Sequence, residues 1–177
     1  MIHNERNERH SQVLNVARQM MTAARTAPKG KGVDIVEIAM AEGDDLSRLS
    51  AEMEVVAEET GMKFFLRDAG NVMESECVVL IGTRPLAQGL NCGHCGYATC
   101  ASRKDGVPCA INSVDVGIAI GSACATASDQ RVDSRVMFSA GVAAQRLGWL
   151  AEGVEQVYAI VLSASSKSPF FDRKPKK

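Results

Sequence analysis

The sequence of 177 residues has little net charge, few histidines and no long apolar run. A formal net charge of −1 gives no positive surplus of the kind that binds nucleic acid or an anionic membrane surface. No apolar stretch reaches the roughly 18 residues that a membrane-spanning helix needs. We therefore expect neither nucleic acid nor a membrane among the partners of this protein.

The three histidines belong to no recognisable catalytic motif. His3 and His10 lie in a polar N-terminal stretch, and His94 lies among cysteines. No Ser/His/Asp triad or hydrolytic metal motif accompanies them. Any chemistry must then come from a bound cofactor, which favours electron transfer.

An export signal is also missing. The opening residues, "MIHNERNERH", contain no apolar core followed by a small-residue cleavage site. We therefore expect a cytoplasmic protein in a reducing compartment. In such a compartment, clustered cysteines bind metal or carry out redox chemistry more often than they form disulfides.

Four of the six cysteines lie in one segment, "LNCGHCGYATCASRKDGVPCA", residues 90–110. They have the spacing C-x2-C-x4-C-x8-C and are Cys92, Cys95, Cys100 and Cys109. Gly93 and Gly96 stand beside them and permit the unusual backbone dihedrals that a loop needs to fold around a compact inorganic core. Backbone N–H groups exposed by such turns can donate to cluster sulfides. An iron–sulfur cluster therefore explains the cysteines and the glycines together.

Other interpretations of these cysteines remain open. Four-cysteine zinc sites usually consist of two C-x2-C pairs, whereas here only Cys92 and Cys95 form one. Redox-active or purely structural thiols are a further alternative. Cys77 lies in an apolar strand and is expected to behave as a small hydrophobic residue. Cys124 either approaches the cluster or packs inside a helix of small residues.

Apolar spacing predicts alternating helices and strands, and hence a single α/β domain over residues 1–177 into which the cysteine-rich loop 90–110 is inserted. Pro28 should end the first helix; Asp44 or Asp45 should cap the second and Gly61 should end it. Asp68 is expected in a turn or cap, and Asp133 or Ser134 at the start of a late helix. The β-branched run 76–83 predicts a strand covered on both faces. The predicted helices are 11–26, 46–60, 113–128 and 134–147, and the predicted strands are 33–40, 62–68, 76–83 and 155–165.

The segment "CGHCGYATC" resembles the C-G-x-C-G-x-x-x-C loop of the four-iron cluster domains in corrinoid iron–sulfur proteins and membrane-bound electron-transport complexes. Cys109 follows sooner than the fourth cysteine of those domains. Over nearly its full length the chain is similar to an uncharacterised family of ferredoxin-domain-containing proteins. The matching pieces are "ARTAPKGKGVD", "FLRDAGNV", "DVGIAIGSA", "RVDSRVMFSAG" and "FFDR". This resemblance implies a 4Fe-4S cluster as cofactor.

The order of elements is similar to the nitroreductase fold, a three-layer α+β sandwich that forms a dimer with FMN at its interface. The resemblance implies a homodimer and FMN as a second cofactor, with the flavin phosphate near Arg25, Lys29 and Lys31 in "RTAPKGKG". A solvated basic turn explains the same three cations. The helix around Gly117, Ala119, Gly121 and Ala123 has the small residues that let a second subunit approach closely. Phe170 and Phe171 in the tail are candidate neighbours for it.

Together these features predict an iron–sulfur redox protein that acts in electron transfer with a redox partner protein, or as an FMN-dependent reductase of a small-molecule substrate. A non-catalytic iron–sulfur sensor or electron-transfer adaptor is the alternative. A zinc-stapled interaction domain is a third class. A coloured protein would distinguish the two iron–sulfur hypotheses from the zinc-stapled domain. Bound flavin would distinguish the reductase from the non-catalytic sensor or adaptor.

Overall fold

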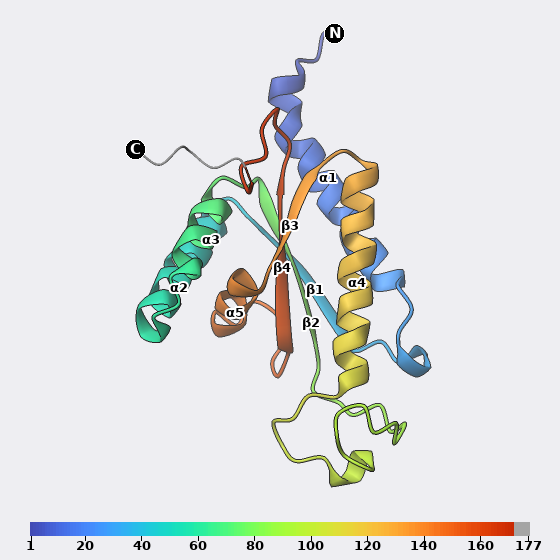
Figure 1. Cartoon of the computed structure of the whole chain (residues 1–177). Helices are drawn as coiled ribbons and strands as arrows, with labels where there is room; N and C mark the ends of the chain where they lie inside the picture. Colours follow the sequence, from blue (N-terminus) through green and yellow to red (C-terminus); the bar gives the residue numbers. More distant parts are fainter. Residues whose placement is uncertain (172–177) are drawn as a thin grey trace.

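A computed structural model describes residues 1–171 and contains a four-stranded sheet with helices on both faces (Figure 1). All neighbouring strands are antiparallel, in the order β1-β2-β4-β3. The strands are β1 (Val36–Glu42), β2 (Cys77–Thr83), β3 (Asp133–Met137) and β4 (Glu155–Ser163).

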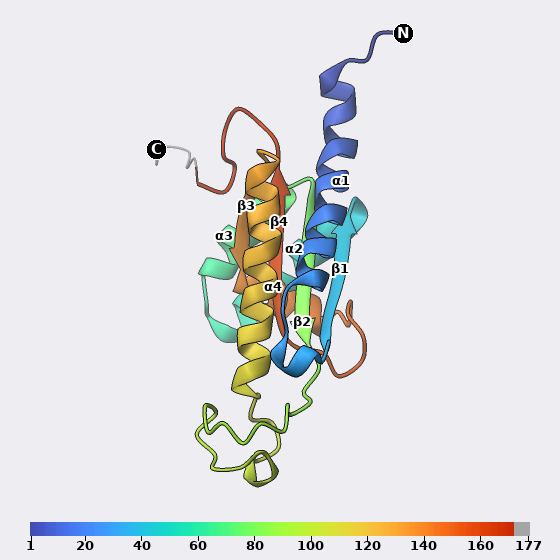
Figure 2. The same cartoon turned by 90° about the vertical axis from the view of Figure 1, so that its right-hand side faces the viewer.

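Two helices cover one face of the sheet and three cover the other, so the predicted three-layer sandwich is confirmed. The helices α1 (Glu5–Thr26) and α4 (Ala110–Asp129) lie side by side on the first face (Figure 2). The second face carries α2 (Asp44–Thr60), α3 (Phe64–Met73) and α5 (Phe138–Arg146). Each face has its own apolar core, with the sheet between them.

Strand β2 is the centre of both cores. All seven of its residues are buried, as the continuous β-branched run predicts. The side chain of Cys77 packs in the core beneath α1 and α4. Burial, together with the nearby carboxylates of Glu42 and Glu76, raises the pKa of its thiol to about 12. Cys77 is therefore an inert, small hydrophobic residue.

Most predicted helix ends lie where proline and glycine place them. Helix α1 ends at Thr26, ahead of Pro28, and Gly61 ends α2 in the left-handed conformation (φ 70°). The cap predicted for α2 is wrong, because Gly43 holds the N-cap position. Asp44 and Asp45 instead occupy the first turn, where their charge favours the positive end of the helix.

Two predicted elements are wrong. Most of the strand predicted at 62–68 lies in α3, which begins at Phe64 and whose buried residues recur at helical spacing: Phe65, Asp68, Ala69 and Val72. The polar Asp68 at a buried position hides this period. The helix predicted at 134–147 begins only at Phe138, because the preceding residues pair with β4 as the edge strand β3. Asp133 and Ser134 consequently lie in a strand and cap no helix.

Asp68 is a core residue and lies in neither a turn nor a cap. It is 5% exposed, and its carboxylate accepts a hydrogen bond from the Ser139 hydroxyl at 2.6 Å. The Arg67 guanidinium pairs with the other oxygen at 2.7 Å. A buried carboxylate is stable when it is paired and hydrogen-bonded in this way. Asp68 thereby ties α3 to the start of α5.

Helix α4 is long and apolar enough to cross a membrane by length and composition alone. Its packing is that of a core helix: one face lies against α1 and the sheet, with Ala119 and Ala123 fully buried. Asn112 and Asp115 are also buried on this helix and make hydrogen bonds to neighbouring loops. The helix therefore belongs to the folded core.

Candidate metal centre

The cysteine loop, residues 84–109, connects the end of β2 to the start of α4 and extends beyond one end of the sheet, opposite the N-terminus (Figures 1 and 2). Its one helical turn is the short 3-10 helix η2 (Cys100–Ser102). Thr99 and Ser102 cap this turn reciprocally, which fixes the backbone on both sides of Cys100.

The base of the cysteine loop is held by buried amides. The Asn112 side chain donates to the backbone carbonyls of Leu86 at 2.6 Å and Arg84 at 3.3 Å. Gln88 in turn donates to the Asn112 side-chain oxygen at 3.1 Å. Asn112 and Gln88 are 1% and 6% exposed, so these bonds are shielded from water. The first turn of α4 therefore fixes where the loop leaves the sheet.

A second anchor comes from the turn η1 (Gly30–Gly32), which follows α1. The Gly30 N–H lies 3.0 Å from both carboxylate oxygens of Asp115. The Lys31 ammonium donates to the Gln88 carbonyl at 3.0 Å. A Cβ on Gly30 would lie 2.6 Å from the Ile111 side chain, so the close approach of this turn to α4 requires glycine.

The four predicted ligands differ in exposure. Cys92 is exposed, Cys95 and Cys100 are half-buried, and Cys109 is buried at the N-cap position of α4. Within residues 1–171, no three His, Cys, Asp or Glu side chains lie close enough together to hold a metal ion. The four sulfurs are therefore not gathered into one coordination sphere.

The glycine turns of the loop are as predicted. Gly93 and Gly96 both have left-handed backbones, with φ of 73° and 86°. The Gly96 N–H donates to the Gly93 carbonyl at 2.9 Å, which closes a tight turn around Cys95. Side chains other than glycine rarely adopt this conformation.

Two of the sulfurs already face backbone donors. The Asn91 N–H points at the Cys100 sulfur, with a nitrogen–sulfur distance of 3.4 Å. Burial raises the pKa of Cys109, but the backbone N–H groups of Gln88, Asn112 and Ile111 and the charge of Arg103 outweigh it, so this pKa lies below its ordinary value. Thiolates are the soft ligands that iron–sulfur clusters use. The donor set therefore fits a cluster.

Cys124 cannot take part in the same centre. It lies 15 residues after Cys109 on α4, which corresponds to about 22 Å along a helix. Burial raises the pKa of its thiol, and a hydrogen bond with Ser134 offsets part of that effect. Packing in the helix is the remaining interpretation of Cys124.

The three cations predicted to hold a flavin phosphate already have partners within the chain. Arg25 pairs with Asp34 at 2.8 Å and donates to the Val36 carbonyl at 2.6 Å. Lys29 donates to the backbone carbonyls of Ala24, Arg25 and Ala27, which caps the end of α1. These contacts use all three donors of an ammonium group, so Lys29 does not fit a phosphate site. Lys31 uses one donor on Gln88.

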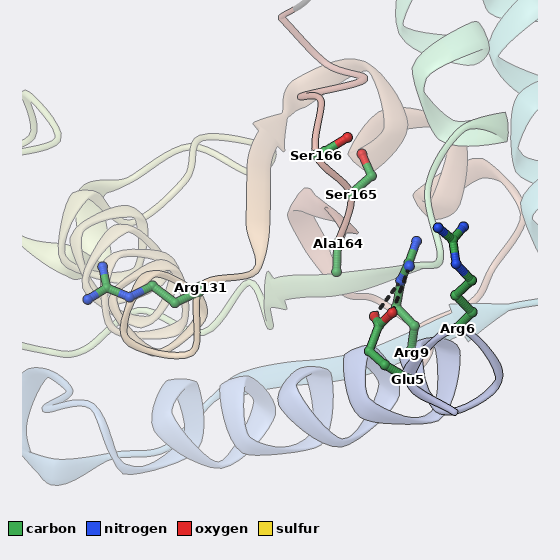
Figure 3. A pocket seen from close by; sticks show the side chains of 7 residues that line it. All are labelled: Glu5, Arg6, Arg9, Arg131, Ala164, Ser165 and Ser166. Atoms are coloured by element: carbon green, nitrogen blue, oxygen red, sulfur yellow. Dashed lines mark hydrogen bonds and ion pairs between the residues drawn. The ribbon is translucent and has the colours of Figure 1, made fainter. Parts of the chain in front are cut away.

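An open hollow of about 440 Å³ lies at the other end of the molecule, between the start of α1 and the loop after β4 (Figure 3). Its guanidinium groups do not converge. Arg9 is paired with Glu5 at 2.8 Å, and Arg131 points away from Arg6 and Arg9 in Figure 3. Elsewhere, the Arg135 guanidinium lies over the Phe171 ring, 4.6 Å from its centroid.

Comparison with known proteins agrees with the resemblance drawn from the sequence. A family model described as "Uncharacterized protein containing a ferredoxin domain (DUF2148)" matches residues 105–173. A protein of Archaeoglobus fulgidus, described as an uncharacterized protein, is 40% identical over 187 aligned residues that cover 100% of both chains. The chain belongs to this ferredoxin-domain family. The part that the family model matches begins after Cys100 and includes Cys109.

Solved structures with the same architecture include nitroreductases. A nitroreductase family protein from Clostridium novyi has a TM-score of 0.59 at 14% identity, over 88% of this chain and 77% of its own. A nitroreductase with bound FMN from Bacteroides fragilis has a TM-score of 0.63 at 12% identity, over 92% of this chain and 83% of its own. The predicted nitroreductase-like fold is therefore confirmed, and at these identities the likeness is one of fold.

Proposed function

We propose that this protein transfers electrons through one 4Fe-4S cluster bound by Cys92, Cys95, Cys100 and Cys109. The family description and the fold both support a redox role in general. The observation that carries the finer proposal is the loop itself: four cysteines, left-handed turns at Gly93 and Gly96 beside them, and backbone donors already directed at two of the sulfurs. A bound cluster of this kind supplies one-electron oxidation and reduction.

The surrounding residues suit this role. Cys109 lies at the N-terminus of the 20-residue helix α4, whose positive end favours the negative charge of a thiolate-ligated cluster. The exposed Cys92 lies on the outer part of the loop, where a redox partner protein can approach. The buried Asn112 and Gln88 hold the loop base in place. A fixed base limits the rearrangement that accompanies electron transfer.

Electron transfer requires that the cluster be reversibly reducible. Anaerobically prepared protein should lose its visible absorbance on reduction with dithionite and regain it on oxidation, over repeated cycles. A protein that contains iron and sulfide but does not respond to reductant would favour the sensor or structural role and contradict electron transfer.

An FMN-dependent reductase is the second candidate, favoured by the likeness to FMN-bound nitroreductases. In that case Arg25 and Lys31, rather than Lys29, have donors left for the phosphate. We then expect the native protein to contain stoichiometric FMN. Lys31→Ala should weaken the affinity for FMN about 5- to 100-fold, because a charge-assisted hydrogen bond to the phosphate is lost. Lys63→Ala, on the exposed start of α3, is the matched control. Protein that neither retains nor takes up flavin would eliminate this candidate and leave the cluster untouched.

We also propose that the protein is a homodimer through the outer face of α4. Ala119 and Ala123, expected at the interface, are buried within the chain, but Gly117, Gly121 and the half-exposed Val114 and Ile118 lie on the outer face. Small residues on this face let a second α4 approach closely, and Val114 and Ile118 supply apolar area to bury. Phe170 packs in the core beneath α2 and α5 of its own chain. Phe170 is therefore not available to cover α4 of a second subunit.

The dimer predicts a specific effect of charge on this face. Ile118→Glu should convert the protein to a monomer in sedimentation velocity, because a carboxylate would be buried without a partner. Val55→Glu is the matched control, since Val55 on α2 is equally exposed, at 41% against 40%. A wild-type protein that sediments as a monomer at micromolar concentration would refute the dimer.

A further inference from the structure

Asn91, next to the first cysteine of the loop, makes two contacts with Cys100. Its side-chain oxygen accepts a hydrogen bond from the Cys100 N–H at 2.8 Å. Its own backbone N–H points back at the Cys100 sulfur at 3.4 Å. The two contacts form a closed ring between residues nine positions apart, so the orientation of the Asn91 N–H and the position of the sulfur are fixed together.

The backbone of Asn91 supports this assignment. It has a left-handed conformation (φ 48°), which asparagine tolerates better than most residues other than glycine. In that conformation its N–H turns toward Cys100. Two other non-glycine residues with positive φ also bond to the loop or to the first turn of α4: Lys31 to the Gln88 carbonyl, and Gln156 to the Ser113 hydroxyl at 2.5 Å. Of the four non-glycine residues with positive φ in residues 1–171, three lie in or contact this end of the molecule, and the fourth, Arg131, lies at the other end of α4.

We infer that Asn91 is a positioning residue that holds Cys100 as a cluster ligand and directs an N–H donor at its sulfur. The inference rests on the proposed 4Fe-4S function and adds a determinant of the reduction potential. A hydrogen bond to a ligand sulfur stabilises the extra negative charge of the reduced cluster and so raises its potential. The Asn91 side chain is not itself a ligand of the proposed cluster; it acts on the cluster through Cys100.

Three variants separate the parts of this inference. Asn91→Gly keeps the left-handed backbone but removes the side-chain acceptor. Asn91→Asp keeps both the acceptor and the tolerance of this conformation, and should keep the Cys100 amide protected; because its carboxylate adds negative charge beside the cluster, it is a control for the exchange experiment alone. Asn7→Ala, on an exposed turn of α1 at the other end of the molecule, is the matched control.

The first readout needs no cluster. In the iron-free protein, amide hydrogen exchange at Cys100 should be about three- to tenfold faster in Asn91→Gly than in the wild type, because the hydrogen bond that protects this amide is lost. Asn91→Asp and Asn7→Ala should leave the exchange rate unchanged. An unchanged exchange rate in Asn91→Gly would mean that the Asn91 side chain does not hold the Cys100 backbone, and would overturn the inference.

The second readout uses the cluster-loaded protein. Asn91→Gly should lose iron to a chelator about 10- to 100-fold faster and should have a lower reduction potential than the wild type, as expected when an outer partner of a metal ligand is removed. Equal potentials and equal iron loss in the two proteins would overturn the inference. If the wild-type protein never assembles a cluster, but Asn91→Gly still speeds amide exchange at Cys100, the proposed function is overturned while the Asn91–Cys100 contact stands.

Discussion

Replacing Cys92, Cys95 or Cys100 with Ala should abolish cluster assembly in anaerobically prepared protein, whereas replacing Cys77 should leave it intact. Each loop variant removes one proposed thiolate ligand, and Cys124 cannot replace it because Cys124 lies about 22 Å along α4 from Cys109. Cys77 is fully buried in the core and its thiol resists ionisation. Iron content and visible absorbance per folded chain give the measurement.

Cys109→Ala belongs in the same series. The lowered pKa of Cys109 and its place at the start of α4 predict that its loss is as severe as that of the other three. Circular dichroism checks that each variant folds. Full iron content in Cys95→Ala or Cys100→Ala would contradict the ligand set, and full iron in Cys109→Ala alone would mean that another group is the fourth ligand.

Gly141→Ala should destabilise the protein by about 3 kcal/mol or more, the range of severe overpacking in a rigid core. Gly141 lies on the face of α5 that contacts β4. A Cβ there would lie 2.0 Å from the Val157 carbonyl oxygen and 2.7 Å from the Tyr158 Cα. Both are backbone atoms of a central strand, so neither can turn aside as a flexible side chain would.

Gly70→Ala is the matched control for this prediction. Gly70 also lies in a helix, α3, but a Cβ there meets nothing within 4 Å. Alanine should therefore stabilise the protein by about 0.5–1 kcal/mol through its higher helix propensity. Urea denaturation of both variants tests the pair. Similar free energies of unfolding for Gly141→Ala and Gly70→Ala would mean that α5 does not pack closely against β4 at Gly141.

The sequence predicts best where local rules and packing agree. Strand β2 is a continuous apolar run and is buried on both faces; Gly61 and Pro28 end their helices as local stereochemistry requires. Prediction from the sequence fails where a residue far along the chain determines the local structure. The sequence of β3 predicts a helix, but pairing with β4 makes it a strand. Asp68 interrupts the apolar helical period of α3, and only its hydrogen bond with Ser139 explains why it is buried there.

The same division holds for the candidate site. The spacing of the cysteines and glycines indicates a cluster-binding loop, because ligand identity and left-handed turns are local properties. The anchors of that loop were not predictable. Gly30 and Asp115 are 85 residues apart, and Lys29 looks like a phosphate ligand in sequence although three carbonyls occupy its donors. Asn91 had one local signal, an asparagine beside the first cysteine at a position suited to a left-handed turn.

The central claim is tested most directly by anaerobic purification of the full chain followed by an optical spectrum and analysis of iron, acid-labile sulfide and zinc. We expect a brown protein with close to four iron and four sulfide per chain, and little zinc, as one 4Fe-4S cluster on four cysteines requires. A colourless protein with stoichiometric zinc and no sulfide would contradict the claim and assign the cysteine loop to a structural zinc site.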